Sequence, residues 1–82
     1  MTTPIRADVR VRLAAGTTTR DYERRLREMS DVVGAQVVVG DFDLTVRVAC
    51  DDDAHLRGTM ARLRQAGAQD LAAELVVRTL LG

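Results

Sequence analysis

The sequence predicts an α+β domain in which two helices cover one face of a four-stranded antiparallel sheet, the ferredoxin-like βαββαβ sandwich that also builds dimeric α+β barrels. Three observations predict it. The chain has 82 residues, enough for one domain with a single core. Four segments have strand character, and two helical segments separate them in the order strand, helix, strand, twice over. No linker or low-complexity stretch divides residues 1–82, so we treat them as one domain.

The first half begins with a strand at residues 5–13, where apolar and charged side chains alternate with a period of two. Thr18 or Thr19 is placed to cap the following helix, because a hydroxyl there accepts a hydrogen bond from a free backbone amide. That helix is expected to end at Ser30-Asp31, and residues 33–39, rich in valine, predict the second strand. The buried face of this first helix is predicted from apolar residues spaced four and three positions apart: Tyr22, Leu26 and Met29.

The second half repeats this order after a tight reversal at residues 40–43. Residues 44–50 alternate again and predict the third strand. In the aspartate run that follows, Asp53 is the expected N-cap of the second helix, and Gly67 is placed to close it. A final strand is predicted over residues 71–80. The buried face of the second helix is predicted to contain Leu56, Met60 and Leu63, with Thr59 beside them.

Both helices on one side leave the other face of the sheet uncovered. Strand periodicity makes that face polar and charged, while the edge of the last strand carries more apolar side chains than a solvated strand needs. A polar face with an apolar edge favours self-association, which also stabilises a domain of this size. The residues expected on the open face are Arg10, Arg12, Thr45 and Arg47, with Glu74 or Arg78; those at the apolar edge are Val76, Leu80 and Leu81.

Composition narrows the function classes. Twelve basic and twelve acidic residues cancel, so no global field attracts a phosphate backbone or an anionic membrane, and we expect neither nucleic acid nor membrane as a direct partner. A single cysteine excludes an internal disulfide and a multi-cysteine zinc site. The N-terminus has no apolar signal-peptide segment, and no stretch reaches membrane-spanning length. A cytoplasmic location is therefore the expectation.

Candidate chemical groups have simpler interpretations. The aspartate run before His55 is expected to cap a helix, because no pair of distant carboxylates obviously converges on it to hold a metal ion. Cys50 lies in phase with the apolar positions of its strand and is expected to be a buried small hydrophobe rather than a nucleophile. The arginines of the first helix alternate with acidic residues, as on a solvated face. We therefore predict no catalytic residue, no metal and no cofactor.

The turn at residues 40–44 is the most informative segment. It is a simple hairpin connection, or it is also a binding site. A glycine turn exposes backbone amides that accept a carboxylate, and a neighbouring aspartate binds an ammonium group. Together, the amides of Gly40 and the carboxylate of Asp43 suit a zwitterionic amino acid better than a phosphate or a sugar.

This segment also resembles a known family. Residues 31–44 read Asp-Val-Val-Gly-Ala-Gln-Val-Val-Val-Gly-Asp-Phe-Asp-Leu and are similar to the middle of the effector (RAM) domain of leucine-responsive/AsnC-type (Lrp/AsnC) transcription regulators. The glycine, the aromatic residue two positions later and the following aspartate match Gly40, Phe42 and Asp43. The resemblance continues over about residues 5–81. It implies a ferredoxin-like fold, dimers joined through their sheets, rings of dimers, and amino-acid effectors bound at subunit interfaces near the turn.

By that resemblance the chain is a stand-alone effector domain without the family's helix-turn-helix. It is expected to form homo-oligomers, to bind an amino acid or related metabolite, and to act on a full-length Lrp/AsnC-type regulator by mixed assembly. Val39 stands where the family often has threonine, and Ala73-Glu74 where small hydroxyl residues are common, with Glu74 a possible partner for an ammonium group. The predicted ligand-binding residues are Val39, Gly40, Asp41, Phe42, Asp43 and Glu74.

Three alternatives stay open at this point. The first is a structural assembly module without a ligand, which the apolar Val39 and Ala73 favour. The second is a small cofactor-free enzyme of the dimeric α+β barrel type, although such enzymes surround their substrate with aromatic residues and this chain has only Tyr22 and Phe42. The third is an ACT-like amino-acid sensor, whose ligand loop would follow the first strand, where Gly16 is the available glycine.

Overall fold

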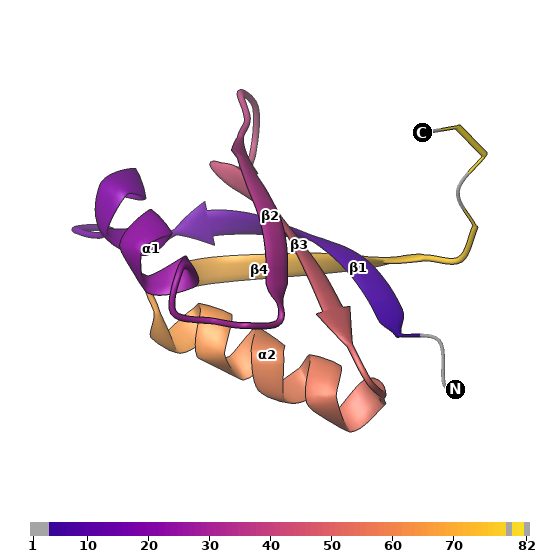
Figure 1. Ribbon diagram of the computed structural model, residues 1–82. Coiled ribbons are helices and arrows are strands. Elements are labelled where there is room, and N and C mark those ends of the chain that lie inside the picture. The colour runs from indigo at the N-terminus through magenta and orange to yellow at the C-terminus, as the bar shows by residue number, and fades with distance from the viewer. Residues whose placement is uncertain (1–3, 79, 82) are drawn as a thin grey trace.

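The computed structural model describes residues 4–78, 80 and 81. Its elements follow the predicted order, and Figure 1 shows the two helices beside one sheet. The strands form one antiparallel sheet in the order β2-β3-β1-β4, so the two edge strands are β2 and β4. The elements are β1 (Ile5–Leu13), α1 (Thr19–Leu26), β2 (Val32–Val37), β3 (Leu44–Cys50), α2 (Asp53–Gln65) and β4 (Ala68–Val76).

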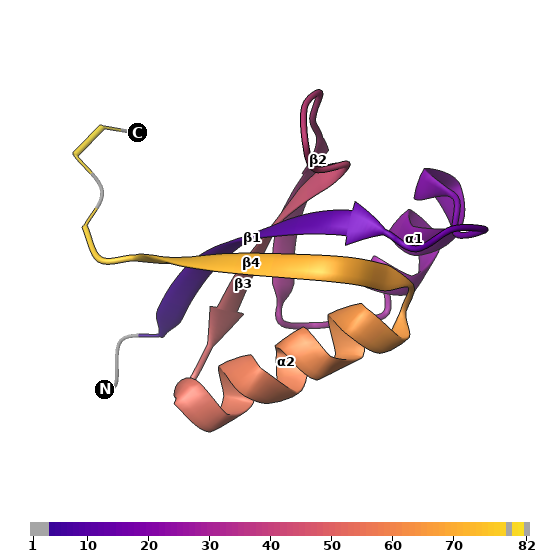
Figure 2. The same cartoon turned by 180° about the vertical axis from the view of Figure 1, so that it is seen from behind.

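The core lies between the sheet and the two helices. The register pairs Val9 with Val46 and Val11 with Leu44, which puts the apolar positions of the two central strands on one face. All four are buried, as the period of two predicts. On the helical side, the Tyr22 hydroxyl of α1 donates a hydrogen bond of 2.9 Å to a backbone carbonyl of α2, so both helices cover the same face. Figure 2 shows α2 running along the sheet from behind.

The helix ends differ from prediction by a few residues. Thr18 caps α1, as expected, by accepting a hydrogen bond of 3.1 Å from a first-turn amide. Asp52, and not Asp53, caps α2, because its carboxylate reaches the His55 amide at 2.8 Å. The prediction that α1 continues to Ser30 is also wrong, since the chain turns after Leu26. Met29 nevertheless packs against the core from the connection.

The predicted strands also shift at their ends. The second strand ends at Val37 rather than at residue 39, because the reversal already begins where the Val38 amide donates to the Asp43 carbonyl. The last strand starts at Ala68 and ends at Val76, since its antiparallel partner β1 begins there, with Arg6 paired to Val76. Within the predicted range 71–80, residue 79 lies outside the part that the structure describes.

Gly67 closes α2 as predicted. Its φ of +130° is a left-handed conformation that strains other residues, and a Cβ there would lie 2.6 Å from the Thr17 methyl. Across the described residues, no helix is long and apolar enough to cross a membrane.

Candidate functional site

The β2–β3 hairpin, residues 38–43, projects beyond the rest of the sheet at the top of Figure 1. Gly40 turns the chain with a φ of +143°, and a Cβ built on it would meet no atom within 4 Å. Val39 beside it is fully exposed. The tip of the hairpin therefore offers backbone groups to a ligand or to a second copy without obstruction from its own chain.

Asp43 ties this hairpin to β1. Its amide donates to the Val11 carbonyl at 2.9 Å, and its carboxylate accepts the Leu13 amide at 2.8 Å. These bonds continue the β1–β3 ladder beyond its last regular pair. Asp43 remains exposed to solvent, so the same carboxylate that anchors the turn also faces outward.

Phe42 bends over the open face of the sheet. The guanidinium carbons of Arg10 and Arg12 each lie 5.2 Å from the centre of its ring, within the range of cation–π attraction. Arg12 also donates from Nε to the Asp41 carbonyl at 2.9 Å. The two arginines thus clamp the base of the hairpin against β1.

The same arginines pair with acids of β4. Arg10 reaches Glu74 at 2.7 Å, and Arg12 reaches Asp70 at 3.2 Å. We name Glu74, Arg10, Phe42, Arg12 and Asp70 the open-face strip. It connects two of the predicted ligand-binding residues, Phe42 and Glu74, through an arginine. All four charged side chains are about half exposed, so solvent screens the pairs and each contributes on the order of 1 kcal/mol or less.

Sequence reasoning thus placed both arginines on the open face but did not include them in the site. The β1–β4 register explains the pairing of Arg10 with Glu74, since Arg10 lies opposite Ala72 and diagonal to Glu74. The contact with Phe42 has no such signal, because the direction of a side chain after a glycine turn is not set by sequence spacing. A third ion pair on this face joins Arg47 to Asp8 at 3.1 Å.

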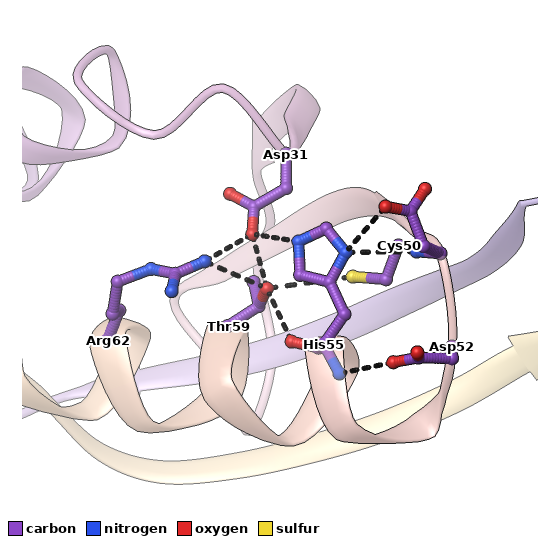
Figure 3. Close-up of polar contacts among 7 residues, drawn as sticks. Asp31, Cys50, Asp52, His55, Thr59 and Arg62 are labelled. Carbon is purple, nitrogen blue, oxygen red and sulfur yellow. Dashed lines mark hydrogen bonds and ion pairs between the residues drawn. The ribbon is translucent and has the colours of Figure 1, made fainter.

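A second polar group lies at the opposite end of β3, inside the helix-covered layer (Figure 3). We name it the Asp31 cluster. Its members come from the α1–β2 connection, the last residue of β3 and the first turns of α2: Asp31, Cys50, His55, Thr59 and Arg62. Among the described residues, every buried side-chain nitrogen and oxygen has a hydrogen-bond partner, and this cluster satisfies its own.

Asp31 is the centre of the cluster and is buried. Its Oδ2 accepts hydrogen bonds from the Thr59 hydroxyl and, at 2.5 Å, from Nη2 of Arg62. Burial alone raises the pKa of Asp31. The bonds from Thr59 and from the backbone, together with the charge of Arg62, outweigh burial and lower the pKa below its ordinary value. Asp31 is therefore an ionised carboxylate inside the protein.

His55 completes the contact on the other side. Its Nε2 lies 3.3 Å from Oδ2 of Asp31, while its Nδ1 accepts the Asp51 amide at 2.9 Å. An acceptor nitrogen carries no proton, so neutral His55 carries its hydrogen on Nε2, facing Asp31. The sequence did not indicate this contact between His55 and a single distant carboxylate. Asp31 arrives from a different loop, and one sequence contains no signal for that pairing.

Cys50 is buried, as predicted. Its Sγ lies 3.6 Å from the Thr59 hydroxyl oxygen, so it also belongs to the polar cluster. A separate apolar groove of about 450 Å³ lies between α1 and β2. Its lining includes Leu26, Val33 and Val37 but none of the predicted ligand-binding residues.

Comparison with known proteins shows the family to which the chain belongs. Residues 6–81 match the sequence profile of the Lrp/AsnC ligand binding domain. The chain belongs to this family. Members of this domain family bind ligands and are not enzymes, which removes the small barrel enzyme from consideration. No curated protein sequence matches the chain.

Solved structures of similar fold agree with this family assignment. The crystal structure of FFRP-DM1 has a TM-score of 0.79 at 27% identity, over 89% of this chain and 99% of that one. A Neisseria meningitidis transcriptional regulator in complex with L-Met has a TM-score of 0.86 at 18% identity, over 99% and 55% of the two chains. A feast or famine regulatory protein of Mycobacterium tuberculosis, complexed with L-methionine, has a TM-score of 0.84 at 17% identity, over 95% of this chain and 53% of that one. The present chain spans about half the length of these two regulators, and at such identity they show the fold.

Proposed function

We propose that this Lrp/AsnC domain senses an amino acid or a related small metabolite at an interface between subunits of a homo-oligomer. The observation that carries the proposal is the family match over residues 6–81, because the family is defined by ligand binding. Two of the solved relatives contain L-methionine, which supports an amino acid as the class of ligand. We place the ligand contacts of this proposal at the β2–β3 hairpin and the open face of the sheet.

The hairpin and the open-face strip together provide both kinds of contact that a zwitterion needs. The amides near Gly40 and the guanidinium of Arg12 are donors for a carboxylate, while Asp43, Asp41 and Glu74 are acceptors for an ammonium group. Phe42 and Val39 supply apolar contact beside them. Glu74 already pairs with Arg10, so a ligand ammonium there shares or replaces that partner.

A second subunit is needed to enclose the ligand. The hairpin tip is convex and exposed within one chain, whereas small-molecule sites bury most of their ligand. A subunit that covers the tip supplies the missing wall. Ligand that binds only the assembled form then stabilises that form by mass action, so ligand concentration controls the oligomer equilibrium.

The open face is the proposed dimer surface. Its three described ion pairs alternate basic and acidic groups, with Arg47 and Asp8 next to the open-face strip. In a two-fold arrangement the same surface meets itself, so an arginine of one copy can meet an acid of the other. Dimers that join further through their hairpins form the larger ring.

We further propose that the domain acts on a full-length Lrp/AsnC-type regulator by mixed assembly. The regulators that it resembles are about twice its length, and their matching halves share the fold from which a mixed dimer would be built. The formal net charge of zero supports a role through protein contacts rather than through direct binding to nucleic acid.

The test is a thermal-shift screen of the purified chain against the twenty amino acids, followed by size-exclusion chromatography with any hit. A ligand at a hundredfold excess over its Kd stabilises by about 2.7 kcal/mol, or several degrees in Tm. Asp43→Asn keeps an oxygen that accepts the Leu13 amide but removes the charge, so it should lose the response while it stays folded. Asp53→Asn, at an exposed position of α2, is the matched control and should keep the thermal-shift response.

An assembly module without a ligand is the second candidate. Apolar side chains at and beyond the end of β4 are exposed, with Leu75 at 55%, Leu80 at 77% and Leu81 at 92%. These favour a contact between chains independent of any ligand. A flat screen, together with an oligomer whose size depends only on protein concentration, would support this candidate and contradict the sensor.

A further inference from the structure

The Asp31 cluster brings together three chemically different metal-binding groups. Asp31, Cys50 and His55 each offer one ligand atom, and these atoms all lie within 4.8 Å of one another. They come from three separate segments, the α1–β2 connection, the end of β3 and the first turn of α2. We propose that they form a binding site for one borderline divalent transition-metal ion, of the zinc or cobalt class.

The distances are close to those of a tetrahedral site. Bonds from zinc to nitrogen, oxygen and sulfur of about 2.0 to 2.3 Å place neighbouring ligand atoms about 3.3 to 3.6 Å apart. Nε2 of His55 and Oδ2 of Asp31 already lie 3.3 Å apart. The sulfur of Cys50 has at most about 1.5 Å to move, since it lies within 4.8 Å of both. A change in one side-chain torsion supplies this movement.

The donor set selects the metal. Imidazole nitrogen and thiolate sulfur beside a carboxylate suit zinc or cobalt, whereas magnesium and calcium take oxygen ligands almost exclusively. Three protein ligands leave a fourth position for water or a small external ligand. One carboxylate and one thiolate neutralise the two charges of the ion, which suits the buried position. The thiol proton leaves to solvent on binding.

Asp51 provides the outer contact that a metal-bound histidine needs. Metal on Nε2 moves the ring proton of His55 to Nδ1, so the hydrogen bond that Nδ1 accepts from the Asp51 amide breaks. The Asp51 carboxylate lies 3.8 Å from the same Nδ1 and is largely exposed, so it is free to turn and accept that proton. A carboxylate–histidine–metal arrangement of this kind fixes the ring and strengthens the ligand.

Arg62 occupies the cationic position in the absence of metal. Its guanidinium lies 2.5 Å from Oδ2 of Asp31, where it neutralises the buried carboxylate. About half of the Arg62 side chain is exposed, so it can swing to solvent when a divalent ion takes over this role. The arginine and the metal therefore compete. This competition distinguishes a metal site from a purely structural polar cluster.

The test is a titration of the chelator-treated, thiol-reduced protein with Co²⁺ alone, followed by displacement with Zn²⁺. Four-coordinate cobalt on a thiolate gives visible ligand-field absorption and a near-ultraviolet charge-transfer band. Cys50 and His55 are the only cysteine and histidine of the chain, so these signals report this site. Cys50→Ala should abolish the charge-transfer band, and His55→Gln should weaken binding at least tenfold. Asp53→Asn is the control and should bind as the parent does.

Arg62→Gln gives the decisive comparison. If Arg62 competes with the metal, this variant should bind Co²⁺ several-fold more tightly than the parent, although its Tm without metal is lower. A parent protein that shows no thiolate–cobalt band at millimolar Co²⁺ would overturn the proposal, as would Cys50→Ala and His55→Gln binding with parental affinity. Because the cluster and the hairpin lie at opposite ends of β3, either result leaves the amino-acid site to be judged separately.

Discussion

The two faces of the sheet are built from the same strands but hold the molecule together in different ways. Toward the helices, Val9, Val46 and Val48 are completely buried. On the reverse face, the residues between them form ion pairs such as Arg10 with Glu74, in which both side chains stay about half exposed or more. Burial of apolar area contributes far more than a solvent-screened ion pair. Stability therefore resides mainly on the covered face, and the open face contributes little to it.

Removal of a core side chain should have the largest effect. Leu63 of α2 is fully buried against the sheet, so Leu63→Ala removes apolar contact and leaves a cavity. We expect a loss of about 2–5 kcal/mol in the free energy of unfolding, measured by urea denaturation. Arg47→Ala, on the open face, should lose at most about 1 kcal/mol. Equal losses for the two variants would contradict the division of roles between the faces.

The sequence predicted the covered face well because its signal is local. Alternation with a period of two in residues 5–13 and 44–50 specifies both the strands and the faces on which their side chains lie. Element ends were less certain, since Asp52 and Asp53 are equally good caps by composition. The hydrogen bond from the His55 amide to Asp52 in the folded chain decides which of the two is the cap.

The polar groups were harder to predict because their partners are distant in the sequence. Asp31 meets Thr59 and Arg62 only after the α1–β2 connection packs on α2. The contact of Phe42 with the two arginines of β1 likewise depends on how the hairpin bends. Neither contact follows from residue spacing, which describes one element at a time. The candidate residues of the turn came from the chemistry of a glycine turn beside an aspartate and from a family resemblance, and their role in binding stays a prediction.

Tyr22 gives a test of the covered face that uses pH. Burial raises the pKa of its hydroxyl to about 12, while the unfolded chain titrates near 10.0. Below pH 10 the contribution to stability is complete, and it is lost as pH rises toward 12 because only the unfolded state ionises. The expected loss is about 2–3 kcal/mol.

The chain favours this measurement because it has one tyrosine and no lysine. The difference in urea stability between the parent and Tyr22→Phe at pH values from 9 to about 12 cancels the thiol of Cys50 and should therefore follow a single group. Tyr22→Phe should remove the fall with pH, at the expense of about 1 kcal/mol at neutral pH for the lost hydrogen bond to α2. A tyrosine that ionises at pH 10 in the folded protein would show that the hydroxyl is accessible to water.

The smallest effect on the stability of the chain is expected at the open-face strip, where the comparison with the effect on the dimer is informative. A double-mutant cycle of Arg10→Ala and Glu74→Ala should give a coupling free energy below about 1 kcal/mol in dilute protein, because both side chains are exposed. If the open face joins two copies, the same variants should weaken the dimer much more than they destabilise the chain. That difference should grow as salt is lowered, since screening decreases. Sedimentation at several protein and salt concentrations measures it, and dimers that tolerate both variants at low salt would place the interface elsewhere.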